Sequence, residues 1–119
     1  MSTKRVVILS DFHAGHRAGL TPPHKWPIPE PASSDDDDRS IRVRKHMQRY
    51  RKLNEECWNW FIGKMGELRK TSPSKKIDVC FFNGDAIDGK QQACGGSEFN
   101  APTMIEQCDM AVHILKRVK

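Results

Sequence analysis

The stretch that decides the fold lies near the start of the chain and reads, from residue 6 to residue 13, Val-Val-Ile-Leu-Ser-Asp-Phe-His. Its first four residues form a short apolar run that is rich in β-branched side chains, and polar residues follow it. This pattern is typical of a strand buried on both faces, as in a parallel sheet. We therefore predict a strand over residues 4–11 with its carboxyl end at Asp11.

A second apolar run predicts a second strand of the same kind. It extends over residues 77–83 and contains Val-Cys-Phe-Phe before Asn83. Between the two strands, residues 14–40 hold five of the seven prolines and the acidic run 35–38, and we interpret them as a long Pro- and Asp-rich loop. The four aspartates are best explained as a solvated segment that leads into a helix N-terminus, where negative charge is favourable.

Two helices are predicted from apolar residues at three- and four-residue intervals. The first covers residues 40–70, with Asp38 or Ser40 as its N-cap, and its predicted inward side is formed by Val43, Met47, Tyr50, Leu53, Cys57, Trp60, Phe61, Lys64 and Leu68. The second begins at about Pro102 and runs to the end of the chain, with Asn100 as its cap. Its predicted inward side is formed by Met104, Ile105, Cys108, Ala111, Ile114, Leu115 and Val118.

The element order β-α-β-α predicts an α/β fold with parallel strands. Ligand sites in such sheets lie outside the carboxyl ends of the strands. Asp11 and His13 follow the first strand, and Asp85 follows the second, after a glycine that allows a sharp turn. Asp11 and His13 are two residues apart, so they project the same way from an extended backbone. Each motif alone is as well explained by a turn or a cap, but their matching positions predict a site where Asp11, His13 and Asp85 bind a metal ion.

The pattern Asp11-Phe-His13 with Gly84-Asp85-x-x-Asp88 resembles the first two motifs of the calcineurin-like metallophosphoesterases, and residues 10–23 resemble the start of phage-type members. The resemblance implies an α/β sandwich that holds two divalent ions, manganese first, with iron, zinc, nickel or magnesium as alternatives. It further implies that Asp11 and His13 bind the first ion, that Asp85 bridges both, and that Asp88 stands behind these ligands.

The resemblance covers only the N-terminal part of such a domain. The family's later motifs, Gly-Asn-His-Asp/Glu, a lone His and Gly-His-x-His, are not in residues 1–119. We therefore expect a single incomplete metallophosphoesterase domain that hydrolyses a phosphoester as phosphodiesterase, nuclease or phosphatase. A second chain or a second copy would complete the sheet and the site. An inactive truncated domain is the alternative within this family.

Two groups of basic residues suggest contacts with phosphate. His16 and Arg17 follow the first motif and are candidate substrate-binding residues, although an ordinary polar loop explains them equally well. Residues 39–52 contain seven Lys and Arg. A basic helix can bind nucleic acid without catalysis, but a solvated helix face is the more common explanation. The aromatic residues that follow, Trp58, Trp60 and Phe61, are more often core at this spacing.

The composition sets outer limits on these interpretations. The chain of 119 residues is 37% apolar and 29% charged, and it carries a formal charge of +5. It has no apolar run of the length that crosses a bilayer, and the start does not read as a signal peptide, so a cytoplasmic protein is the expectation. The four cysteines form no Cys-x-x-Cys pair, which predicts free thiols: Cys57, Cys80, Cys94 and Cys108.

Overall fold

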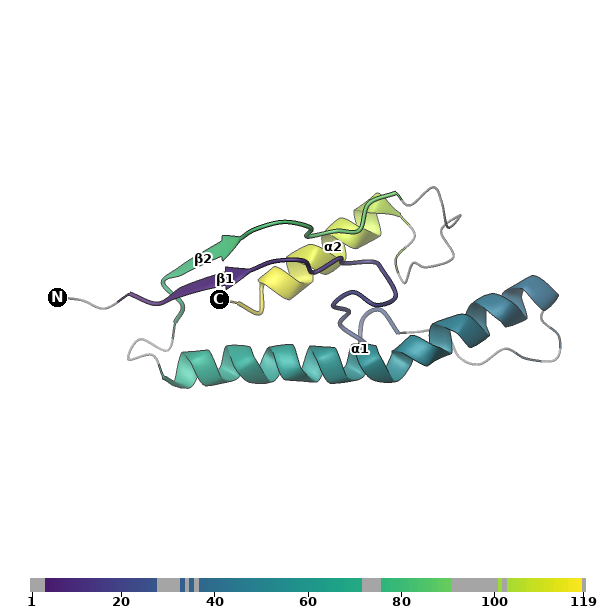
Figure 1. The fold of residues 1–119 in the computed structure, drawn as a ribbon, viewed down its shortest axis with the longest axis horizontal. Coiled ribbons are helices and arrows are strands. Elements are labelled where there is room, and N and C mark those ends of the chain that lie inside the picture. The colour runs from purple at the N-terminus through teal and green to yellow at the C-terminus, as the bar shows by residue number, and fades with distance from the viewer. Residues whose placement is uncertain are drawn as a thin grey trace.

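Two short parallel strands and two helices make up the described part of the chain (Figure 1). The computed structural model describes residues 4–27, 33, 35, 37–71, 76–90, 101 and 103–118. Strand β1 (Val6–Leu9) pairs in parallel with β2 (Val79–Phe82), with Val6 opposite Val79 and Leu9 opposite Phe82. The predicted α/β class, element order and parallel pairing are confirmed, although both strands are shorter than expected.

The sheet is buried on one face only, so the prediction of two buried faces is wrong. Val7 is buried, and Leu9 and Phe82 pack against the hydrophobic core. On the opposite face Ile8 is 71% exposed and its partner Phe81 is 59% exposed. The run was apolar on both sides, but the described helices bury only one side. The outer face therefore remains an exposed apolar surface.

Helix α1 (Asp38–Lys70) begins two residues before the predicted start. Its N-cap is Asp37, whose carboxylate accepts a hydrogen bond of 2.7 Å from the amide of Ser40, so the predicted caps Asp38 and Ser40 are wrong. The hydrogen bond to Ser40 lowers the pKa of Asp37. The helix ends at the C-cap Thr71.

The buried side of α1 is rotated by about one residue from the predicted side. Its buried residues are Met47, Asn54, Trp58, Phe61 and Met65, whereas Trp60 is 66% exposed and Leu53 is 41% exposed. Trp58 and Phe61 belong to the core cluster with Phe12. The rings of Phe12 and Phe61 meet edge to face at 5.9 Å, and the rings of Trp58 and Phe61 are also 5.9 Å apart. The core interpretation holds for Trp58 and Phe61 and is wrong for Trp60. No residue from 38 to 46 is buried, so the first turns of α1 extend beyond the core (Figure 1).

Helix α2 (Met104–Leu115) is shorter than the predicted element and is capped by Thr103. The hydroxyl of Thr103 accepts from the amide of Glu106, and the Glu106 carboxylate accepts from the amide of Thr103, which forms a capping box. The predicted cap, Asn100, lies outside the described residues. The inward side contains Gln107, Met110, Ala111 and Ile114, while the predicted members Met104, Ile105 and Cys108 are exposed.

The segment after β1 is folded against the rest of the molecule over residues 14–27. Ala14 forms a parallel bridge with Ile87, and Thr21 and Pro22 are fully buried. The first part of the predicted long loop, residues 14–27, is therefore ordered and packed against the molecule. Its last residues form the N-cap and the first turn of α1. Residues 28–32, 34 and 36 of this loop lie outside the described part.

The cysteines and the apolar character of the helices are the next features of the structure. Cys57, Cys80 and Cys108 are free thiols, as predicted, and Cys94 lies outside the described residues. Neither described helix has the length and apolar character needed to cross a membrane.

A cluster of four rings joins the loop to both helices. His113 of α2 lies 5.5 Å from His24, 5.7 Å from Trp26 and 6.2 Å from Trp58, measured between ring centres. The Nε2 atom of His113 is buried, with no hydrogen-bond partner in the described structure. Burial, together with the positive charges of Arg117 and Lys25, lowers the pKa of His113 below its ordinary value of 6.5.

Protonation of His113 is expected to destabilise the fold as the pH decreases. The unfolded chain keeps the ordinary pKa, so between the two pKa values the unfolded state binds more protons. The stabilisation from the neutral ring is complete above pH 6.5 and is lost as the pH falls through the folded-state pKa. Urea titrations between about pH 8 and about pH 5 should show wild type losing stability relative to His113→Phe. A difference that is independent of pH would contradict this expectation.

Candidate metal centre

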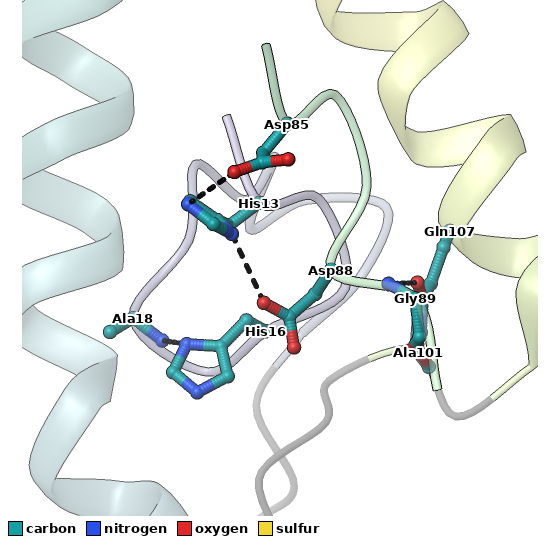
Figure 2. Close-up of polar contacts among 8 residues, drawn as sticks. All are labelled: His13, His16, Ala18, Asp85, Asp88, Gly89, Ala101 and Gln107. Carbon is teal, nitrogen blue, oxygen red and sulfur yellow. Dashed lines mark hydrogen bonds and ion pairs between the residues drawn. The ribbon is translucent and has the colours of Figure 1, made fainter. Parts of the chain in front are cut away.

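Three side chains of types that can bind a metal ion converge where the two strands end. Asp11 and His13 follow β1, Asp85 follows β2, and one ligand atom from each lies within 4.8 Å of the other two. The Nε2 atom of the His13 ring lies 3.8 Å from Oδ2 of Asp85 (Figure 2). The Asp85 side chain is 66% exposed and that of His13 is 40% exposed. The structure thus brings together residues that are more than 70 positions apart in the sequence.

The backbone reaches this arrangement through strained residues rather than an extended strand. Asp11 has a φ of 56° and His13 a φ of 45°, in the left-handed region that non-glycine residues rarely adopt. The expectation of an extended backbone at these residues is therefore wrong. Such a conformation costs about 1–3 kcal/mol per residue and persists only where neighbouring structure imposes it. Here the amide of His13 donates to Asp85 O at 2.9 Å, which ties the strained turn to β2.

Asp88 lies directly behind His13. Its Oδ1 atom is 3.1 Å from Nδ1 of His13, and its side chain is only 6% exposed (Figure 2). A carboxylate can only accept a hydrogen bond, so Nδ1 of His13 is the donor. In the neutral imidazole with this hydrogen bond, the nitrogen free to bind an ion is Nε2, on the side of Asp85. This carboxylate–histidine pair is the usual way in which a metal-binding imidazole is oriented.

The residues fit a divalent ion by chemistry and by spacing. Two carboxylates and one imidazole form the mixed oxygen and nitrogen set that transition metals accept. Metal–ligand bonds of about 2.0–2.2 Å allow two ligands of one ion to be at most about 4.4 Å apart, so small side-chain rotations would suffice. A further sign is Oδ2 of Asp88, which is buried and has no hydrogen-bond partner in the described structure. A buried acceptor without a partner favours a positive or hydrogen-bond-donating group in this region.

Glycines allow the surrounding chain to approach the ligands closely. Gly84 has a φ of 92° and produces the predicted turn before Asp85. A Cβ atom at Gly19 would lie 2.1 Å from the carbonyl oxygen of His13, and one at Gly15 would lie 2.4 Å from the side chain of Gln107. The loop therefore passes beneath His13 with no room for a side chain.

Gln107 is a supporting residue that sequence analysis did not identify. Its side chain is completely buried and binds Gly89 twice, accepting from the amide at 2.9 Å and donating to the carbonyl at 3.2 Å (Figure 2). It also donates to Ala101 O at 3.1 Å. Gly89 follows Asp88, so α2 fixes the carboxylate that orients His13. One sequence signal could have indicated this role: Gln107 is a polar residue on the same apolar helix face as Ala111 and Ile114.

A cavity of about 380 Å³ opens beside the ligands. It is lined by Asp11, His13, His16, Ala18, Gly19, Leu20 and Asp88. His16 therefore lies where a substrate could reach it, and its Nδ1 accepts from the amide of Ala18 at 3.2 Å. Arg17 is not among the lining residues, because its guanidinium carbon lies over the Tyr50 ring, 4.9 Å from the ring centre. The structure separates these two candidate substrate-binding residues.

The geometry of the chain itself supports a metal centre at this position. Three ligand atoms converge at the strand ends, two of the ligands occupy strained backbone, and a buried carboxylate orients the imidazole. Comparisons with protein families, with curated proteins and with solved structures found no match to this chain.

Proposed function

We propose that this protein is a metallophosphoesterase that hydrolyses a phosphoester with divalent metal ions. The observation that carries the proposal is the convergence of Asp11, His13 and Asp85 at the carboxyl ends of two parallel strands. The sequence resemblance supports the same assignment, because these are the residues that its two motifs single out. Nuclease, phosphodiesterase and phosphatase activities belong to this class.

Each residue of the site has a distinct task in this proposal. Asp11 and Asp85 supply negatively charged oxygens, and His13 supplies Nε2 while its Nδ1–H is held by Asp88. When bound, the ions would activate water and offset the charge that develops on the phosphate. His16, at the wall of the cavity, is placed to donate a hydrogen bond to a phosphate oxygen.

The proposal includes a partner, either a second polypeptide or a second copy of the chain. Three ligands do not fill the coordination of two ions, so the proposed site needs further ligands. The exposed side chains of Ile8 and Phe81 leave a sheet face onto which a partner could pack. The expected metal is manganese, with iron, zinc, nickel or magnesium as alternatives.

Manganese binding is the first test. The full chain is expected to bind Mn²⁺ in calorimetric titrations, and Asp11→Asn or Asp85→Asn should reduce the affinity at least about a hundredfold, since even residues behind the ligands contribute about 10–100-fold. Asp109→Asn is the matched control, because Asp109 is an exposed aspartate on α2. Equal Mn²⁺ affinity of wild type and both site variants would overturn the proposal.

Hydrolysis is the second part of the same test. The Mn²⁺-loaded chain should hydrolyse p-nitrophenyl phosphoesters in a manner that depends on Asp85 and increases more than proportionally with protein concentration if a second copy completes the site. A linear increase that Asp85→Asn abolishes would retain the function and remove the need for a partner. Hydrolysis that is unchanged by removal of the metal would contradict the proposed chemistry.

A further inference from the structure

The positive charge of the molecule is concentrated in the first half of α1. Residues 38–52, which we call the basic arm, contain seven Lys and Arg and one Asp, a formal charge of +6. The whole chain carries +5, so all the other residues together contribute −1. Residues 53–70 of the same helix hold three acidic and three basic side chains and are neutral. If the charges of α1 served only to keep its surface soluble, the positive charge would not need to be concentrated in the first half of the helix.

The charges of the basic arm are accessible. Nothing from residue 38 to 46 is buried, and Arg42, Lys45 and Arg49 are all exposed. These three residues fall at three- and four-residue intervals, so they share one face of the helix. No ion pair between described residues involves any of them, whereas Arg51 and Lys52, at the end of the arm, pair with Glu55 and Glu56. Arg42, Lys45 and Arg49 therefore form a row of exposed cations on one face of the helix.

The end of the basic arm lies near the wall of the metal-site cavity. At its end, Tyr50 carries the guanidinium of Arg17 on its ring. One turn later, Asn54 donates to Arg17 O at 2.8 Å and to Gly19 O at 3.2 Å. Gly19 and the neighbouring His16 line the cavity. These contacts place Arg17 and part of the cavity wall next to the end of the basic arm.

We propose that the substrate is a nucleic acid whose phosphate backbone binds the basic arm. Arg42, Lys45 and Arg49 span about 10 Å along the helix axis at 1.5 Å per residue. One strand of a duplex carries a phosphate about every 3.4 Å of its axis, so several phosphates lie within the length of this row. A helix that binds membranes needs an exposed apolar face opposite its cations. Among the large apolar residues of the arm Met47 is buried and only Val43 is exposed, so an extended apolar face is lacking.

This inference rests on the proposed function only in calling the bound nucleic acid a substrate. Binding itself requires no metal, so the test uses EDTA, which separates the arm from the metal centre. A labelled oligonucleotide longer than the arm, as single strand and as duplex, is titrated with the full chain between about 50 mM and about 200 mM salt. Binding without any metal-dependent cleavage would count against the proposed function alone.

The decisive comparison is between two triple variants with the same change in charge. Arg42→Ala/Lys45→Ala/Arg49→Ala should weaken binding about tenfold and reduce the salt slope by about three, since each lost phosphate contact lowers it by about one. Lys4→Ala/Lys70→Ala/Lys116→Ala removes three exposed cations elsewhere and should bind like wild type. Alanine favours helix, so the arm variant should keep its helical circular dichroism.

Several results would overturn the proposal. Absence of binding by wild type at low salt, or affinity that does not change with salt, would remove the arm as a nucleic-acid surface. Equal weakening by both triple variants would show an effect of net charge alone. Equal affinity for polyglutamate, or tighter binding to vesicles of phosphatidylserine and phosphatidylcholine, would assign the arm to another class of partner.

Discussion

Replacing Gly19 by alanine is expected to destabilise the protein by about 3 kcal/mol and to abolish tight metal binding. The new methyl group would lie 2.1 Å from His13 O and 3.0 Å from Phe12 O. Both are backbone atoms, so no side-chain rotation can relieve the contact. The loop must move away from His13, which also breaks the hydrogen bond of 2.9 Å from the amide of Leu20 to Phe12 O.

The matched control for this substitution is Gly63→Ala. Gly63 lies in the interior of α1, and a Cβ atom there would meet nothing within 4 Å. Alanine should therefore stabilise the helix by about 0.8–1 kcal/mol. Urea denaturation and Mn²⁺ titration of both variants give the comparison. A Gly19→Ala protein as stable as wild type would show that the loop does not pass beneath His13 as closely as described.

Replacing Gln107 by alanine is the second substitution with a large expected effect, about 3–5 kcal/mol in the free energy of unfolding. The substitution leaves the amide and carbonyl of Gly89 and the carbonyl of Ala101 without their partner, and it opens a cavity in the core. It also releases the chain beside Asp88, so the remaining folded protein should bind Mn²⁺ about 10–100-fold more weakly.

Two further variants separate support of the site from general stability. Ile105→Ala, at a position of the same helix that is 76% exposed, should change the free energy of unfolding by less than about 0.5 kcal/mol. Gln107→Glu keeps the acceptor for the Gly89 amide but removes the donor to both carbonyls, so its Mn²⁺ affinity should be reduced even where the protein is folded. Unchanged Mn²⁺ affinity in folded Gln107→Glu would show that Gln107 does not support the site.

The strands and the convergence of the ligands could be predicted from the sequence because both depend on simple local patterns. Two apolar runs on either side of a long helix require parallel pairing, and parallel pairing places Asp11 near Asp85. The helix faces were predicted less well. The spacing of apolar residues predicts that Leu53 and Trp60 face inward, whereas Asn54 and Trp58 are buried instead. Asn54 is buried because it binds loop carbonyls 35 and 37 residues away, which no local pattern reveals.

The supporting parts of the site were hidden for the same reason. Gln107 is stable in the core only because three backbone groups from two other segments meet its amide. The left-handed backbone at Asp11 and His13 likewise depends on contacts with the segment after β2. Sequence patterns identify which side chains can bind a metal, while long-range packing decides how those side chains are held.

The pairing of β1 with β2 has a consequence for the order in which the molecule folds. His13 and Asp88 are 75 residues apart, and the intervening chain includes all of α1. Contacts of such high sequence separation form late, because a long loop must close first, whereas a helix forms through local contacts. The candidate ligands therefore come together only after β1 and β2 have paired. Metal binding would then mainly slow unfolding and would change the folding rate little, because the ligands are not yet together in the transition state for folding.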